Sequence, residues 1–162
     1  MSPTRREVVF QLAALAALPL SFPRLDVFAD VPSDPLGGTI AEFQAGRRRH
    51  LWTSAEMTAH ALQRCRTDGK TWHAIDALSA TAMADARASD ARLRAGKLRG
   101  PLDGVPLFAK AIYDMNGLPT TGSSMEWADL FPEPVHRDAL EVQRMRAAGA
   151  VVLGKTAADD FA

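Results

Sequence analysis

The segment Gly100-Pro-Leu-Asp-Gly-Val-Pro-Leu-Phe-Ala-Lys110 ends in a short apolar run, which Gly104 and Lys110 bound. Residues 105–109 have the length and composition of a buried β-strand. Pro106 has no backbone N–H to donate, so we expect it at the start of the strand or on a sheet edge. The segment therefore predicts an early strand of a β-sheet.

Lys110 is the residue of this segment with candidate chemistry. It follows an apolar strand and precedes Ala111-Ile112-Tyr113, so its surroundings are mostly nonpolar. The side chain either reaches water from the strand end or is buried, and burial favours the neutral amine that can act as a base. Considered alone, the position favours a lysine that reaches water.

Helices are predicted on the amino-terminal side of this strand. Thr39-Ile-Ala-Glu42 and Thr53-Ser-Ala-Glu56 are capping boxes, in which threonine and glutamate satisfy free backbone amides at a helix start. The second of these helices is expected to end at Gly69, and Trp52 and Met57 are placed to pack together across its start.

A third, alanine-rich helix is predicted over residues 78–95 and is ended by Gly96. Its Asp90 and Arg94 are expected to form an i,i+4 pair on the solvent-exposed face. The run Arg47-Arg48-Arg49 is expected to be a solvated helix end.

The order of elements after Lys110 completes an α/β pattern. Residues 117–124 are a loop by composition, Asp138 is expected to cap a helix that Gly149 ends, and residues 150–153 form a second apolar strand. Helices, strand, helix, strand indicate an α/β fold whose sheet is incomplete in this chain.

Charge, spacing and composition argue against several functions. The 162 residues, enough for one domain, carry 19 basic and 19 acidic side chains, so nothing indicates nucleic-acid binding. Residues 149–156 match the phosphate-loop expression, but the residues between its glycines are apolar and strand-like, so we expect their amides in a sheet. His50, His60, His73 and His136 lack metal-ligand spacing, and Cys65 fits a packing role.

The first thirty residues have the parts of a secretory signal. Arg5 and Arg6 precede an apolar run that extends to Phe22, and Val27 and Ala29 mark a cleavage site. Paired arginines favour the twin-arginine route, and the run is shorter than the roughly 20 residues of a stable membrane span. A buried core helix or an uncleaved anchor is the alternative.

We therefore predict a signal peptide at residues 1–29, a linker rich in proline and glycine at 30–38, and one globular domain at 39–162. No lipid-attachment cysteine follows the apolar run, so a soluble periplasmic or extracytoplasmic product is expected.

Several blocks of the domain resemble the amidase signature family. They are the segment 100–110, Asp114, Gly117-Leu-Pro-Thr-Thr-Gly-Ser-Ser124 and the block from Asp138 to Thr156. The resemblance covers residues 39–162 and implies the N-terminal part of the amidase fold, in which helices lead into a central mixed sheet covered by helices.

The resemblance also implies a mechanism for amide hydrolysis without a metal or cofactor. A serine nucleophile acts with a second serine in a cis peptide, and Lys110 matches the family's lysine, a neutral general base. The family commonly has aspartate where Ala111 stands here. Both serines lie beyond Thr156 in the family, and Ser123 and Ser124 match a different, upstream loop.

The resemblance predicts a small-molecule amide substrate for the complete enzyme, and the export signal argues against a role on aminoacylated tRNA. This chain alone is expected to be inactive, because Lys110 cannot hydrolyse an amide without the serines. The alternatives are a non-catalytic scaffold that binds a ligand and an interaction module whose helices pair with another chain. The sequence does not determine the oligomeric state.

Export can be tested by changing the paired arginines. Arg5→Lys with Arg6→Lys keeps the positive charge but removes the pair that the twin-arginine route requires, so the protein should remain in the cytoplasm. Cell fractionation with immunoblotting measures this, with Arg24→Lys as the control. Unimpaired export of the double variant would contradict the twin-arginine assignment.

Overall fold

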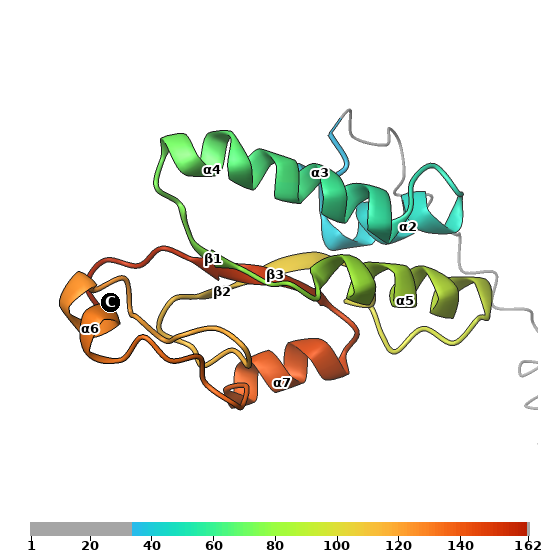
Figure 1. The fold of residues 1–162 in the computed structure, drawn as a ribbon. Coiled ribbons are helices and arrows are strands. Elements are labelled where there is room, and N and C mark those ends of the chain that lie inside the picture. The colour runs from blue at the N-terminus through green and yellow to red at the C-terminus, as the bar shows by residue number, and fades with distance from the viewer. Residues whose placement is uncertain (1–33, 162) are drawn as a thin grey trace, which may run out of the picture.

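A computed structural model describes residues 34–161 and shows a mixed β-sheet between two layers of helices (Figure 1). The described strands are β1 (Ile75–Leu78), β2 (Pro106–Lys110) and β3 (Val151–Thr156). They lie in the order β1-β3-β2, with β3 parallel to β2 and antiparallel to β1. The predicted signal peptide and the start of the predicted linker lie outside the described residues.

The helices of the described part divide between the two faces of the sheet. They are α2 (Ile40–Arg48), α3 (Ser54–Arg66), α4 (Asp68–Thr71), α5 (Ala82–Arg94), α6 (Met125–Leu130) and α7 (Leu140–Ala147). Helices α3 and α5 cover one face and α7 covers the other (Figure 1). Within residues 34–161, no helix is long and apolar enough to cross a membrane.

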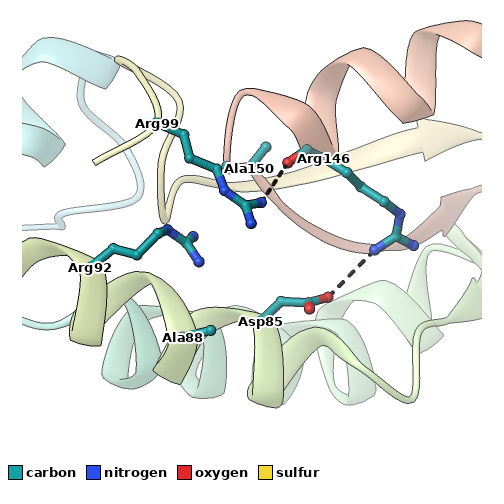
Figure 2. A pocket seen from close by; sticks show the side chains of 7 residues that line it. Asp85, Ala88, Arg92, Arg99, Arg146 and Ala150 are labelled. Carbon is teal, nitrogen blue, oxygen red and sulfur yellow. Dashed lines mark hydrogen bonds and ion pairs between the residues drawn. The ribbon is translucent and has the colours of Figure 1, made fainter. Parts of the chain in front are cut away.

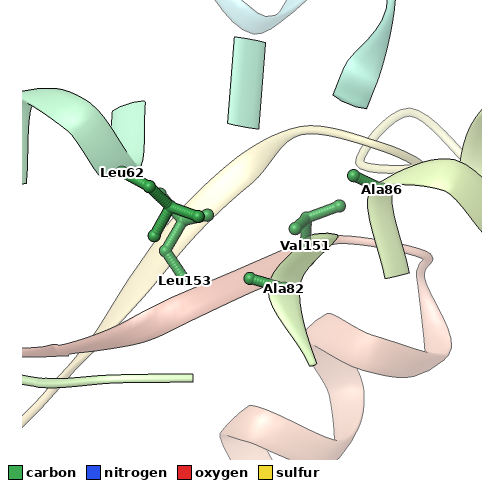
Figure 3. Packing of buried hydrophobic residues seen from close by; sticks show 5 residues of the cluster. All are labelled: Leu62, Ala82, Ala86, Val151 and Leu153. Carbon is green, nitrogen blue, oxygen red and sulfur yellow. The ribbon is translucent and has the colours of Figure 1, made fainter. Parts of the chain in front are cut away.

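Strand β3 supplies core residues to both faces because successive side chains of a strand point in opposite directions. Val151 and Leu153 pack against Leu62 of α3 and against α5 (Figure 3). Val152 packs on the other face with Val142 of α7. A strand covered on both faces is apolar at consecutive positions, and this explains the unbroken run that the sequence shows.

The α/β class and the two capping boxes are confirmed. The Thr39 side chain accepts a hydrogen bond from the Glu42 amide, and the Glu42 carboxylate accepts one from the Thr39 amide, at 3.2 and 2.7 Å. Thr53 and Glu56 make the same exchange at the start of α3. Pro106 is the first residue of β2, as predicted, and β2 is an edge strand in the described sheet.

The predicted boundaries around the third helix are wrong. Residues 75–78 form β1, an edge strand, and α5 begins only at Ala82. Residues 75–78 pair with β3, although the sequence pattern predicts a helix from residue 78. The Ser79 amide extends this pairing by donating to the Leu153 carbonyl at 2.8 Å. Gly69 does not end a helix but lies inside α4, where an added Cβ would come within 2.9 Å of Ile75.

The predicted cap of α7 is also wrong. Ala139 occupies the cap position without a side-chain hydrogen bond. The Asp138 carboxylate instead accepts from the Asn116 amide at 2.8 Å and pairs with Arg146 at 3.0 Å. Asp138 therefore holds the loop that follows β2 against α7.

Arg47 and Asp90 form a buried ion pair, which corrects two expectations. Arg47 is completely buried, not solvated, and its guanidinium lies 3.0 Å from the Asp90 carboxylate. Asp90 does not pair with Arg94. It also accepts from the Ser54 and Ala55 amides at 2.8 and 3.0 Å, so a residue of α5 caps the start of α3.

The turn before β2 closes around the same ion pair. The Arg47 guanidinium also donates to the Asp103 carbonyl and, at 2.9 Å, to the Ser89 hydroxyl. At Gly104, which has φ +82°, a Cβ atom would overlap Arg47 and Ser89. The glycine that bounds the apolar run is therefore required by the buried arginine.

Asp103 anchors this turn through its side chain. Arg92 donates two hydrogen bonds to its carboxylate at 2.8 and 2.7 Å, and the Arg99 amide donates a third at 2.8 Å. Burial, the largest single influence, raises the pKa of Asp103, but the hydrogen bonds from Arg92, Ser89 and the Arg99 amide, with the Arg92 charge, together lower it. Asp103 is therefore ionised at neutral pH.

Candidate functional site

Lys110 lies at the carboxyl end of β2, opposite Thr156 of the parallel strand β3. Its side chain is exposed, and within residues 34–161 its amine has no hydrogen bond or ion pair. Of the two interpretations of Lys110, the described residues therefore match the lysine that reaches water. Ligands of open α/β sheets bind at this edge, where the strands end.

The loop 117–124 returns to the same edge of the sheet. The Gly122 amide donates to the Ala111 carbonyl at 3.4 Å, and the Thr121 hydroxyl donates to the Asp76 carboxylate at 3.1 Å. Asp76 belongs to β1 and lies where the register with β3 shifts. The loop thus connects β1, through Asp76, with Ala111, the residue after Lys110. Sequence reasoning did not single out Asp76.

Lys155 is the buried lysine of this region, and sequence reasoning missed it. Its amine donates to the Pro119 carbonyl at 2.6 Å and to the Thr120 hydroxyl at 3.0 Å, and Thr120 in turn donates to Asp114 at 2.9 Å. Burial lowers the pKa of Lys155, while the charges of Asp76 and Asp114 oppose the shift. Lys155 therefore ties β3 to the loop beside Lys110.

Gly154 explains how Lys155 comes to face the loop. The register between β2 and β3 shifts at this point, and a Cβ atom on Gly154 would overlap the Ala77 carbonyl oxygen of β1. The sequence predicted a strand over residues 150–153, whereas β3 continues to Thr156. The expectation that the residues between Gly149 and Gly154 belong to a sheet is confirmed for residues 151–153. Because the predicted strand ended at residue 153, it left out Lys155.

Ser123 and Ser124 serve the loop itself. Ser123 has φ +62°, and its hydroxyl accepts from the Ala158 amide at 2.8 Å. The Ser124 hydroxyl donates to Glu126 at 3.2 Å. Neither hydroxyl contacts Lys110, so the described residues do not pair a serine with this lysine.

The histidines and Cys65, which the sequence offers as possible metal ligands or as a reactive thiol, do not form a site in the described residues. Among residues 34–161 no group of three histidine, cysteine, aspartate or glutamate side chains could hold a metal ion. Cys65 is half-buried in α3, and burial raises the pKa of its thiol against the opposing Arg66 and Arg64 charges. The reactive thiolate is therefore disfavoured at neutral pH.

A model of the amidase family matches residues 56–162, which include Lys110, the loop 117–124 and β3. The chain belongs to the amidase family. A glutamyl-tRNA(Gln) amidotransferase subunit of Methylococcus capsulatus is 42% identical over 126 residues, which make up 76% of this chain and 25% of that protein. The same subunit of Anaeromyxobacter sp. (strain K) is 39% identical over 124 residues, with the same shares of the two chains.

Solved amidase structures share the fold. The native peptide amidase from Stenotrophomonas maltophilia superposes with a TM-score of 0.67 at 34% identity, over 72% of this chain and 24% of that chain. An amidase family protein from Bacillus anthracis gives a TM-score of 0.67 at 25% identity, over 75% of this chain and 24% of that chain. The chain thus spans about a quarter of the length of the relatives it matches, and the described sheet is a partial amidase sheet.

The buried amine of Lys155 predicts a pH-dependent stability. Its pKa is lowered in the folded protein, so the unfolded chain holds the proton more tightly and the charge opposes folding below the folded pKa. This cost to the free energy of unfolding decreases as pH rises through the folded pKa toward 10.5, the ordinary pKa of a lysine, because the buried amine then loses its proton. Relative to Lys155→Met, the wild-type chain should therefore gain stability as pH rises toward 10.5.

Urea unfolding at a series of pH values measures the difference between wild type and variant. Lys97→Met is the matched control, since the Lys97 side chain is exposed and its removal should not change the slope with pH. A wild-type-minus-Lys155→Met difference that stays flat, or falls, as pH rises would contradict burial of the charge.

Proposed function

We propose that this chain supplies the first part of an amide hydrolase and that Lys110 is its general base. The observation that carries the proposal is the position of Lys110 within the amidase match, at the carboxyl edge of the sheet. The polar loop 117–124, held by Lys155 and Asp76, lies beside it. This edge is where a substrate and a nucleophile can reach the amine.

The proposed chemistry follows from the resemblance to the family. As the family resemblance implies, the Lys110 amine accepts a proton from the intermediate serine, which takes one from the nucleophilic serine as that oxygen attacks the amide carbonyl. Lys110 returns this proton through the intermediate serine to the leaving nitrogen as the carbon–nitrogen bond breaks, and the amine departs. Water then hydrolyses the acyl-enzyme and releases the acid and the free serine. Both serines are expected C-terminal to Thr156, in the portion of the relatives that this chain does not span.

The proposed substrate is a small or peptide-like amide outside the cytoplasm. The predicted signal at residues 1–29 supports this location, and it argues against the tRNA-linked role that the names of the amidotransferase relatives state. One structural relative is named a peptide amidase, which agrees with an amide on a small molecule or peptide.

A scaffold that binds without catalysis is the second candidate. Large apolar side chains are exposed around α6, among them Met125 at 81% and Leu130 at 70%. Such a surface favours contact with further protein, which is supplied either by the rest of an amidase domain or by another chain. The two candidates differ in whether Lys110 is needed for turnover.

A chimera tests the role of Lys110. Residues 34–162 of this chain would replace the corresponding part of the Stenotrophomonas maltophilia peptide amidase, whose intact form serves as the positive control. In an active chimera Lys110→Ala should lower kcat by about 100-fold or more, because a general base contributes on that order. Peptide-amide hydrolysis measures kcat, and circular dichroism checks the fold.

Lys97→Ala, which removes another exposed lysine, is the matched control and should leave kcat within about twofold. Full turnover in the Lys110→Ala chimera would remove Lys110 from the mechanism. A loss of turnover in both lysine variants would point to a general effect of charge.

A further inference from the structure

A cavity of about 270 Å³ lies where α5, the loop before β2, α7 and the start of β3 meet (Figure 2). Its lining residues are Asp85, Ala88, Arg92, Arg99, Arg146, Gly149 and Ala150. The cavity adjoins the amino-terminal end of β3, whereas Lys110 lies at the carboxyl end of β2. The proposed hydrolysis of amides therefore does not use it.

Three arginines from three different elements converge on this cavity. Arg92 comes from α5, Arg99 from the loop before β2 and Arg146 from α7, and their side chains lie over the α5 residues Asp85 and Ala88 (Figure 2). The lining thus contains three cations and a single carboxylate. Small side chains line the rest of the cavity and leave room for a ligand.

The existing partners of the three arginines differ. Arg92 is held by two hydrogen bonds to the buried Asp103. Arg146 pairs with Asp138 at 3.0 Å and more weakly with Asp85 at 3.4 Å. Asp103 and Asp138, which do not line the cavity, therefore hold the two guanidiniums in place. Asp85 also holds Arg146 from within the lining.

Arg99 has no carboxylate partner among residues 34–161. Its guanidinium makes one hydrogen bond, from Nη1 to the Arg146 carbonyl at 3.3 Å, which aims the side chain into the cavity (Figure 2). The other guanidinium N–H groups remain free for a ligand, and the planar guanidinium matches the geometry of carboxylate and phosphate oxygens.

We propose that this cavity binds a small oxyanion, the carboxylate or phosphate group of a small molecule. Arg99 donates the principal hydrogen bonds, because Arg92 and Arg146 already have carboxylate partners. A bound anion would supply the charge partner that Arg99 lacks among the described residues, and Asp85 opposes binding because its carboxylate shares the cavity. The cavity therefore serves as a binding site for a ligand or a regulator.

NMR titration of the 162-residue chain with inorganic phosphate, and separately with sodium acetate, tests the site at constant ionic strength. Saturable shifts of the Arg99, Arg146 and Ala150 amides are expected with at least one of the two anions. Stronger binding of phosphate indicates a phosphate-bearing ligand, and stronger binding of acetate indicates a carboxylate. Either result supports the proposal.

Three variants separate a built site from general attraction of anions. Arg99→Gln should weaken binding at least fivefold, and Asp85→Asn should tighten it. Arg87→Gln, which removes an exposed charge of α5 outside the cavity lining, should leave it unchanged. Absence of saturable shifts with both anions, or equal weakening by Arg99→Gln and Arg87→Gln, would overturn the proposal.

Discussion

The buried ion pair between Arg47 and Asp90 is the interaction on which the described fold depends. It joins α2 to α5, and the two carboxylate oxygens of Asp90 also cap α3 through the Ser54 and Ala55 amides. Removing either charged partner would leave the other buried without compensation, which in proteins costs about 3–5 kcal/mol. The ion pair therefore restricts which residues can stand beside it. At Gly104, for example, any Cβ atom would overlap the Arg47 guanidinium.

The same interaction determines where the candidate site lies. The Gly104 amide donates to the Gly149 carbonyl at 2.8 Å, and the Val151 amide donates to the Val105 carbonyl at 2.9 Å, so the starts of β2 and β3 are joined next to the ion pair. Parallel pairing then carries both strands to the opposite edge, where Lys110 faces Thr156. Lys155 fixes the loop 117–124 at that edge. The ion pair thus stabilises the end of the sheet where β2 and β3 begin, and the Lys110 amine lies at the opposite end.

Local signals in the sequence predicted much of this fold. Capping boxes, the β2 strand and the glycine at the end of α7 depend on neighbours close in the chain, and these predictions are confirmed. Asp90 and Arg47 lie 43 positions apart, so helix periodicity alone placed both of them in solvent. Strand β1 and the buried Lys155 were missed for the same reason, since pairing with β3 and burial under the loop are tertiary effects. Within the site, the position of Lys110 at a strand end was predictable, whereas Asp76 was not.

A double-mutant cycle on Arg47 and Asp90 measures directly whether their pairing holds the scaffold together. The unfolding free energies of wild type, Arg47→Met, Asp90→Asn and the double variant would be compared by urea denaturation of the 162-residue chain. We expect each single change to destabilise by about 3–5 kcal/mol and the double variant to recover at least about 1.5 kcal/mol of the summed loss. Effects that add to within about 0.5 kcal/mol would show that the two residues act independently, and would contradict the central role of their pairing.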